Sequence, residues 1–324
     1  MKRIATPLVQ FSPISEKEVH NILKKTTQKT YELDPLPSSL LYEIIDLLLP
    51  AFTNIINRSL LSGEVPSEFK TAVVKPLLRK VSLDLNQMKN YRPVSNLPFL
   101  SKILEKVDLM QLTNHLTSNH LTHKFQSAYC AGHSTETALL HIVSDILTAS
   151  DASRIFILTL LNLLAAFDTI DHSILLCCLE QHFGVSGLAV SWFKSYMSNR
   201  FQFVSASGSN SKLSKLDCGV PQGSVLGPIL FVLYAQPLSQ ILFNHSCTHQ
   251  FFVDVIQMRK SCNAPKTCVS DMKDWMTENK VQLNADKTET ILLNSLKLEH
   301  PPAPLKICQA TISVSNSGTL VSST

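Results

Sequence analysis

The sequence predicts an α+β fold with a mostly antiparallel sheet built around a split βαβ unit. Residues 1–150 carry mainly helical periodicity, and strand-like segments become frequent from residue 155 onward. From that point the segments follow the order strand, helix, strand, strand, helix, strand, which is typical of a split βαβ arrangement. Hydrophobic residues make up 44% of the 324 residues and charged residues 17%, so we expect a packed core.

Residues 1–60 predict a helical N-terminal extension. Ser15 is a candidate N-cap, and Val19, Ile22 and Leu23 recur with helical spacing behind it. The segment DPLPSSLLYEIIDLLLPAFTNIINRSLLSG predicts a proline-rich turn followed by a pair of apolar helices.

Residues 61–150 predict two short extended pieces followed by helices. Ala72–Val74 has strand character and ends at a basic turn, and Tyr91–Val94 is extended before a helix that begins near Ser101. The segment STETALLHIVSDILTAS predicts an amphipathic helix whose start is framed by Ser134 and Thr137.

The remaining residues predict the sheet. Ile155–Leu161 reads as a strand, and SILLCCLEQHFG as a helix that Gly184 closes. FQFVSA is a further strand, and a glycine-rich loop then enters a helix at Gly227–Pro228. HQFFVDVIQMRK predicts two short strands around Asp254, and CVSDMKDWMTENKVQLNADKTETILL predicts a helix, a turn and a strand.

Positive charge is concentrated in one stretch of the chain. Residues 61–106 carry eight basic and four acidic side chains, an excess of four that equals the net charge of the whole chain, +4. The basic residues are Lys70, Lys75, Arg79, Lys80, Lys89, Arg92, Lys102 and Lys106. Such a surface suits a polyanionic partner, although charge alone favours an ordinary solvated face.

Membrane insertion and secretion are not expected. The start of the chain carries no signal peptide, and the most apolar stretches, LLYEIIDLLLPAF and IFILTLLNLLAAF, fall short of the roughly 20 residues that cross a bilayer. The eight cysteines are scattered without a CxxC pair, which favours a reducing intracellular compartment, nuclear or cytoplasmic. HSCTH with Cys262 and Cys268 matches no standard zinc pattern, so free thiols and surface histidines are favoured.

Six stretches, in order, resemble the reverse transcriptase domain of LINE-type (non-LTR) retrotransposons, on the jockey-like branch. They are LDPLPSSLL, NYRPVSNLPFLSKILEKV, FQSAYCAGHSTETALL, AAFDTIDHSILL, GVPQGSVLGPILF and LNADKTE, between Leu33 and Glu289. The resemblance implies a right-hand polymerase with a helical extension (1–60), fingers (61–150) and a palm (151–324) that ends near the primer grip. Compared with such elements, we expect the thumb to be largely absent and no endonuclease to precede the domain. The implied activity is RNA-directed DNA synthesis from deoxynucleotides with Mg²⁺, on an RNA template and a DNA primer bound independently of sequence.

The metal-binding positions depart from the family pattern. By resemblance, three aspartates should stand at 162, 254 and 255, and this chain has Asn162, Asp254 and Val255. An amide oxygen brings no negative charge to a hard cation, and valine brings no ligand atom. Asp168 and Asp171 follow the strand too late to substitute, and capping of the next helix is their expected role. We therefore expect Asp254 to be the one remaining metal carboxylate and Mg²⁺ binding to be impaired.

Other positions match the family. Phe167 would be the aromatic plate that excludes a ribose 2′-hydroxyl, with a core phenylalanine as the alternative reading. Gln222 and Gly223 would bring backbone close to the nucleotide and template. The expected triphosphate contacts are Lys80, Arg92 and Lys287, with Lys75 and Arg79 as further candidates. Cys130 stands where the family suggests arginine.

Three functional hypotheses follow from the sequence. The first is a polymerase with weak residual activity, the second a catalytically dead nucleic-acid binder, and the third a decayed gene product without a function. The substitutions at Asn162 and Val255 favour an inactive copy.

Overall fold

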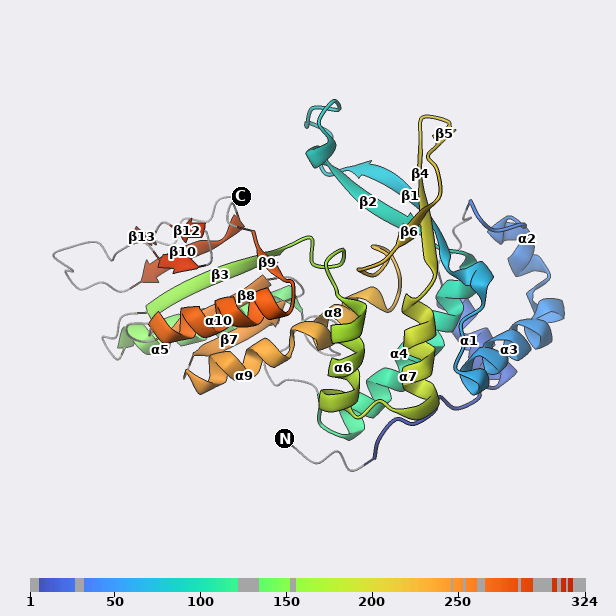
Figure 1. The fold of residues 1–324 in the computed structure, drawn as a ribbon, viewed down its shortest axis with the longest axis horizontal. Helices are drawn as coiled ribbons and strands as arrows, with labels where there is room; N and C mark the ends of the chain where they lie inside the picture. Colours follow the sequence, from blue (N-terminus) through green and yellow to red (C-terminus); the bar gives the residue numbers. More distant parts are fainter. Residues whose placement is uncertain are drawn as a thin grey trace. The chain divides into compact units, whose positions relative to one another are not determined.

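The computed structural model describes residues 6–26, 32–121, 134–151, 156–245, 247–252, 255–260, 266–284, 287–293, 305–307, 310–312 and 314–316. The chain divides into two compact units, each built from two separate segments. Unit 1 comprises Met1–Leu121 and Ile170–Leu230, and unit 2 comprises Thr122–Thr169 and Phe231–Thr324. Most elements of both units are labelled in Figure 1.

Unit 1 begins with the predicted helical extension. In α1 (Glu16–Lys24), Ser15 and Glu18 form a reciprocal capping box, which confirms Ser15 as the N-cap. The apolar helix pair is α2 (Ser38–Glu43) and α3 (Ile45–Ser62). The next long helix, α4 (Phe99–Ser118), begins two residues before the predicted start, where the Phe99 N–H donates to Asp34 Oδ1 at 2.8 Å.

Two later helices complete the core of unit 1. In α6 (His172–Phe183), Asp171 accepts from the backbone N–H groups of Ser173 and Ile174, and Gly184 ends the helix at φ 63°. Both caps were expected. The sequence reading missed α7 (Gly187–Met197), which buries an aromatic cluster of Phe11, Trp192, Phe193 and Tyr196.

The sheet of unit 1 joins early and late parts of the chain. Its path runs β2 (Tyr91–Asn96), β1 (Thr71–Leu78), β4 (Arg200–Ala206), β5 (Ser209–Asn210), and β6 (Ser214–Leu216) pairs with β4. β1 is antiparallel to β2 and parallel to β4. The 3₁₀ turns Ser67–Phe69 and Met88–Asn90 precede β1 and β2. FQFVSA is thus a strand, as predicted, and it belongs to this sheet.

The sheet of unit 2 contains the predicted split βαβ unit. Its path is β13 (Val314–Asn316), β10 (Glu289–Leu293), β3 (Phe156–Leu164), β8 (Val255–Lys260), β7 (Thr248–Phe252), and β9 (Gln282–Leu283) pairs with β3. The β10–β3, β3–β8 and β8–β7 pairs are antiparallel, and β10–β13 is parallel. β3 continues to Leu164, three residues beyond the predicted end, because it also pairs with β9. A separate hairpin joins β11 (Leu305–Ile307) to β12 (Ala310–Ile312).

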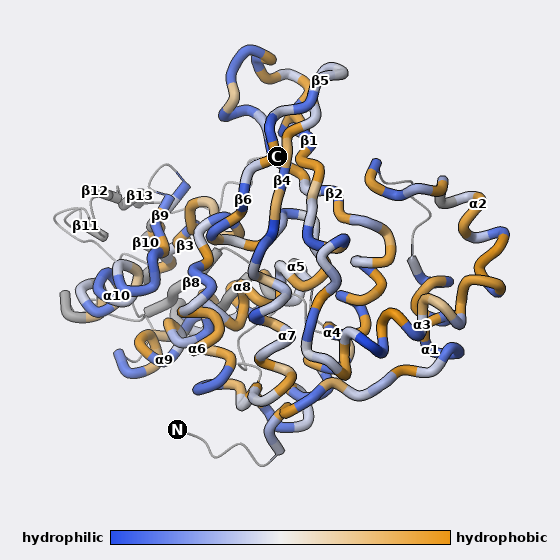
Figure 2. The backbone as a smooth tube through the Cα atoms, turned by 45° about the vertical axis from the view of Figure 1, so that its right-hand side comes forward, coloured by the Kyte–Doolittle hydropathy of each residue, from blue (hydrophilic) through white to orange (hydrophobic). Residues whose placement is uncertain are grey.

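The helices of unit 2 differ in how apolar they are. They are α5 (Thr135–Asp151), α9 (Pro237–Asn244) and α10 (Lys266–Glu278), and the unit boundary falls within α8 (Gly227–Ala235). Residues 230–235 of α8 are all buried, which suits a helix that is hydrophobic around its whole circumference, whereas α10 is mostly hydrophilic along the tube (Figure 2). None of the described helices is long and apolar enough to cross a membrane.

A charged cluster is buried inside unit 1. Glu105 and Asp108 on α4 are 1% and 0% exposed, and Arg200 and Tyr196 are buried with them. Burial and the neighbouring Glu105 carboxyl raise the pKa of Asp108 well above its usual range, and burial likewise raises the pKa of Glu105. Neither oxygen of Asp108 has a hydrogen-bond partner in the part of the chain that the structure describes.

The Asp108→Asn variant is expected to be more stable than the wild type at neutral pH. A carboxyl whose pKa is raised by folding contributes stability at acidic pH that is lost as pH rises through the folded pKa. The asparagine has nothing to ionise, so its advantage should be small near pH 4 and grow toward pH 7. Thermal unfolding midpoints across this range measure it. Asp274→Asn, at an exposed position of α10, is the matched control and should show no such growth. An advantage that stays flat with pH would contradict the buried-carboxyl account.

Candidate active site

Two of the three predicted metal positions lie opposite each other in the sheet of unit 2. Asn162 on β3 pairs with Val255, the first residue of β8, in antiparallel register. Val255 also pairs with Phe252, the last residue of β7, so β7 and β8 form a hairpin. Asp254 itself lies outside the described residues. The structure therefore places positions 162 and 255 on neighbouring strands, and the position of Asp254 relative to Asn162 stays a prediction.

The backbone of Asn162 is fixed from a second direction. Its carbonyl accepts from the Asn284 N–H at 2.7 Å, and its own N–H donates to Thr288 Oγ1 at 3.4 Å. The Thr288 hydroxyl also donates to the Asn284 carbonyl at 2.8 Å. The LNADKTE segment therefore braces β3 at Asn162. Lys287, which lies in the same segment, is exposed and donates its backbone N–H to Asn284.

The two further aspartates take different places. Asp171 caps α6 through its Oδ1 atom, the helix-start role that the sequence indicated. Asp168 lies in the turn between β3 and α6, where its N–H donates to the Ala165 carbonyl at 2.8 Å. Asp168 therefore lies before the helix and does not start it. Cys130 falls outside the described residues.

Phe167 follows β3 in the same turn. Its ring lies 5.8 Å from the ring of Phe231, measured between centroids, with the planes tilted by 52°. Phe231 is 1% exposed, whereas Phe167 is only half-buried. Phe167 therefore packs against a core ring and keeps part of its surface exposed, and its role as an aromatic plate stays a prediction.

Gln222 and Gly223 lie against the backbone of β2 in unit 1. The Ser95 N–H donates to the Gln222 carbonyl at 2.7 Å. Gly223 has a φ of 122°, and a Cβ there would lie 2.7 Å from the Ser95 carbonyl oxygen. Glycine is therefore required by this chain's own backbone, whatever else the loop contacts. The Gln222 Oε1 atom is buried and has no hydrogen-bond partner among the described residues.

Glu105 supports the same loop, and the sequence reading missed it. Its Oε2 atom accepts from the backbone N–H groups of Val225 and of Leu226, the latter at 3.1 Å. These donors lie between Gly223 and the start of α8, so one carboxylate satisfies N–H groups that precede the helix. Burial raises the pKa of Glu105. The positive charge of Arg200 acts in the opposite direction and favours the ionised carboxylate as the acceptor. The signal in the sequence was a glutamate, Glu105, within the otherwise mainly apolar and basic helical segment SKILEKV.

The basic surface is smaller than the sequence suggested. Lys70 is 9% exposed and donates to Ser195 Oγ, and Lys106 donates to Thr26 Oγ1. Lys75 forms an ion pair with Glu32 at 2.8 Å. Of the eight basic residues in 61–106, the exposed ones lie on or between β1 and β2, and they are Lys75, Arg79, Lys80, Lys89 and Arg92. The exposed positive charge of this segment is thus gathered on one hairpin of unit 1.

The described residues do not fit a pair of magnesium ions. Of the two positions that the structure describes, Asn162 offers a neutral amide oxygen and Val255 offers no ligand atom. Within the described ranges, no three His, Cys, Asp or Glu side chains are grouped so that they could hold a metal ion.

Comparison with solved structures identifies the fold. The chain is similar to apo telomerase from Candida tropicalis truncated from its C-terminal domain, with a TM-score of 0.52 and 12% identity over 84% of this chain and 58% of that one. The class of protein is therefore an α+β protein with the fold of a telomerase chain.

The family follows from the sequence comparison. Residues 78–312, more than half of the chain, match the family of reverse transcriptases (RNA-dependent DNA polymerases), and the chain belongs to this family. The "Probable RNA-directed DNA polymerase from transposon X-element" of Drosophila melanogaster is 26% identical over 91% of this chain. The RNA-directed DNA polymerases from mobile element jockey are 27% identical over 86% of the chain in Drosophila melanogaster and 30% over 68% in Drosophila funebris.

These relatives confirm the resemblance to LINE-type reverse transcriptases. The chain spans about a third or less of each relative's length, namely 33%, 32% and 24%.

Gly223→Ala is expected to destabilise unit 1 more than Gly208→Ala does. Both glycines have positive φ, which costs an alanine about 1–2 kcal/mol. A Cβ at Gly223 also meets the Ser95 backbone at 2.7 Å, whereas a Cβ at Gly208 meets nothing within 4 Å. Thermal unfolding of the two variants separates the steric contact from the backbone conformation. Equal losses would show that the loop does not press against β2.

Proposed function

We propose that this chain is the reverse transcriptase domain of a non-LTR retrotransposon and that this copy does not catalyse DNA synthesis. The observation that carries the proposal is the pairing of Asn162 with Val255 on adjacent strands. The family places carboxylates at both positions. Here neither residue supplies one, while the strands that present them are paired in regular register.

The chemistry explains why these two substitutions matter. Phosphoryl transfer to a primer hydroxyl uses two magnesium ions held about 3.5–4 Å apart. Magnesium favours carboxylate oxygens in octahedral geometry. With Asn162 and Val255, the protein's contribution falls from three negative charges to the one of Asp254. Each 1.4 kcal/mol of lost transition-state stabilisation lowers the rate about tenfold, so two missing carboxylates are expected to remove measurable activity.

The other predicted residues would retain their parts in substrate binding. The sheet of unit 2 would serve as the palm, and the β1–β2 hairpin would belong to the fingers. Phe167 would oppose a ribose 2′-hydroxyl, and Gln222 and Gly223 would approach the nucleotide and template through a backbone that Glu105 supports. Lys80, Arg92 and Lys287 would contact phosphates.

Nucleic-acid binding without catalysis is the second candidate function. It is favoured by the exposed cations gathered on the β1–β2 hairpin, where Arg92 pairs with Leu77 and where Arg79 and Lys80 directly follow the end of β1. Cations that neutralise phosphates release counterions, so binding of this kind is salt-dependent and independent of base sequence.

The unmodified protein is expected to give no detectable deoxynucleotide incorporation with Mg²⁺ on a primed RNA template. Restoring Asn162→Asp alone should help little, and Asn162→Asp with Val255→Asp should help more than the two single changes together, because metal ligands act as a unit. Primer extension resolved on a gel measures all four proteins. Asn210→Asp, which adds the same charge on exposed β5, is the matched control and should change nothing.

One result would overturn the proposal of an inactive copy. That result is primer extension by the unmodified chain that disappears in the Asp254→Ala variant. It would show that a single aspartate suffices, and that the residues at 162 and 255 are compatible with catalysis.

Binding to a primer–template is expected to weaken as salt rises. The logarithm of the affinity should fall linearly with the logarithm of the salt concentration. The triple variant Arg79→Ala, Lys80→Ala and Arg92→Ala should bind more weakly and with a shallower salt slope. Fluorescence anisotropy across a salt series measures both. The control removes three exposed lysines elsewhere, Lys17, Lys212 and Lys273. Affinity that is unchanged in the hairpin variant, or no binding at low salt, would exclude this function.

A further inference from the structure

A pair of buried thiols lies in unit 2, in residues that the proposed function does not use. Cys247 stands just before β7, and Cys268 lies in the first turn of α10. Their sulfur atoms are 3.9 Å apart, and the two residues are 5% and 0% exposed. They are separated by 21 positions in the sequence, so spacing alone did not indicate a pair.

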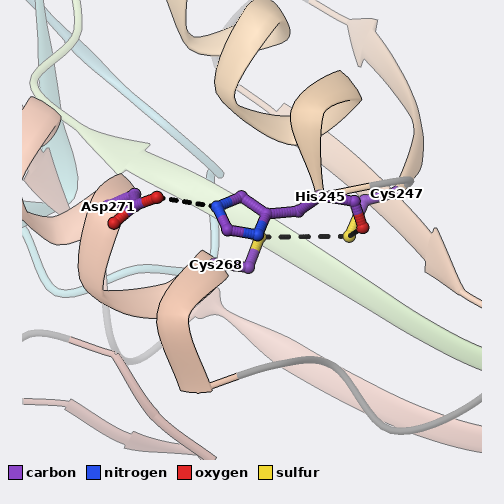
Figure 3. A network of polar contacts seen from close by, with 4 residues as sticks. All are labelled: His245, Cys247, Cys268 and Asp271. Carbon is purple, nitrogen blue, oxygen red and sulfur yellow. Dashed lines mark hydrogen bonds and ion pairs between the residues drawn. The ribbon is translucent and has the colours of Figure 1, made fainter.

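A second contact holds the same two segments together. The ring of His245 contacts Asp271, with 2.7 Å between Nε2 and Oδ2. Asp271 follows Cys268 by three residues, so both side chains project from one face of α10. Figure 3 shows His245 and Cys247 on the segment that precedes β7, with Cys268 and Asp271 facing them from α10. The polar contact therefore fixes the distance between the segments that carry the thiols.

The segment that carries Cys247 is itself well anchored. The Cys247 N–H donates to the Leu242 carbonyl at 2.9 Å, which ties it to the end of α9. The Cys247 carbonyl lies 3.1 Å from Nδ1 of His249, whose Nε2 atom lies 3.0 Å from Ser239 Oγ. His249 and Ser239 are each 1% exposed. Cys247 is thus held in position by buried contacts on its own side.

Metal binding does not account for this cluster within the described residues. No three His, Cys, Asp or Glu side chains there are grouped so that they could hold a metal ion. The sequence favoured free thiols and surface histidines here, and the surface position is wrong for His249, which is 1% exposed. Two thiols in contact have a chemistry that scattered cysteines do not have.

We propose that Cys247 and Cys268 form a reversible disulfide when hydrogen peroxide oxidises the protein. One thiolate attacks the O–O bond, giving a sulfenic acid and hydroxide, which is protonated to water. The second thiol attacks the sulfenic sulfur, the S–S bond forms, and a second water leaves. Two thiols lose two electrons and one peroxide becomes two waters. The sulfurs would close from 3.9 Å to the bonded distance of about 2.05 Å.

The burial of the two thiols favours a small oxidant, and their location determines which elements the disulfide would join. A small uncharged peroxide reaches thiols that are 5% and 0% exposed more readily than a bulky charged disulfide such as oxidised glutathione. The bond would join the start of β7 to α10. Because β7 continues into the hairpin with β8, the bond would restrain the element that presents Val255.

The test is disulfide mapping of the purified full chain. The folded protein is treated with hydrogen peroxide, remaining thiols are alkylated, and peptides are analysed by mass spectrometry without reduction. The expected product is a peptide pair joined through Cys247 and Cys268, which dithiothreitol separates. The thermal unfolding midpoint should rise by a few degrees on oxidation and return on reduction.

Matched variants and a denatured control decide the interpretation. Cys247→Ser and Cys268→Ser should each lose the cross-link and the thermal shift. Cys178→Ser, which removes another buried thiol, from α6, should keep both. Wild-type protein oxidised in urea should give mixed cysteine pairings. Comparing it with folded wild type shows whether the fold selects the pair, even if a variant fails to fold. The proposal is overturned if the folded wild type keeps both thiols, oxidises them without joining them, or pairs either with another cysteine.

Discussion

The antiparallel pairing of β3 with β8 is the interaction on which the arrangement of unit 2 depends. It sets Asn162 opposite Val255, and β10, β9 and the LNADKTE segment are all added to the same strand. Side chains alternate between the faces of a strand, so a slip of one residue would exchange every inward and outward position. Contacts from Asn284 and Thr288 hold Asn162 from a second side. Under the proposed function, the residues at these two positions decide whether the sheet can hold metal ions.

The stretches that carry the family resemblance also maintain the fold. Asp34 caps α4, Glu105 accepts from the backbone after the Gln222–Gly223 loop, and Thr288 braces β3. None of these contacts involves the side chains at positions 162 and 255. The chain can consequently keep the scaffold of a reverse transcriptase while its proposed metal site changes, because packing and backbone hydrogen bonds do not require the missing carboxylates.

Local signals predicted the elements well, and long-range contacts were harder to foresee. Ser15, Asp171 and Gly184 act within a few residues, so their capping roles could be inferred from the sequence. The split βαβ order predicted that β3 and β8 are neighbours, but it did not predict the register of their six residue pairs. In contrast, β4 pairs with β1 across more than a hundred residues, and Lys70 is buried against Ser195 despite its place in a basic segment. Neither the partner of a strand nor the burial of a lysine is encoded in local spacing.

The central claim is that positions 162 and 255 determine whether the sheet of unit 2 holds divalent cations. Binding of Mn²⁺, followed by electron paramagnetic resonance, tests it without requiring turnover. The account predicts that the Asn162→Asp, Val255→Asp double variant binds Mn²⁺ at least about tenfold more tightly than the wild type, a difference of about 1.4 kcal/mol. Equal binding by the two proteins, lost in both on Asp254→Ala, would contradict it, because Asp254 would then hold the ion without the other two carboxylates.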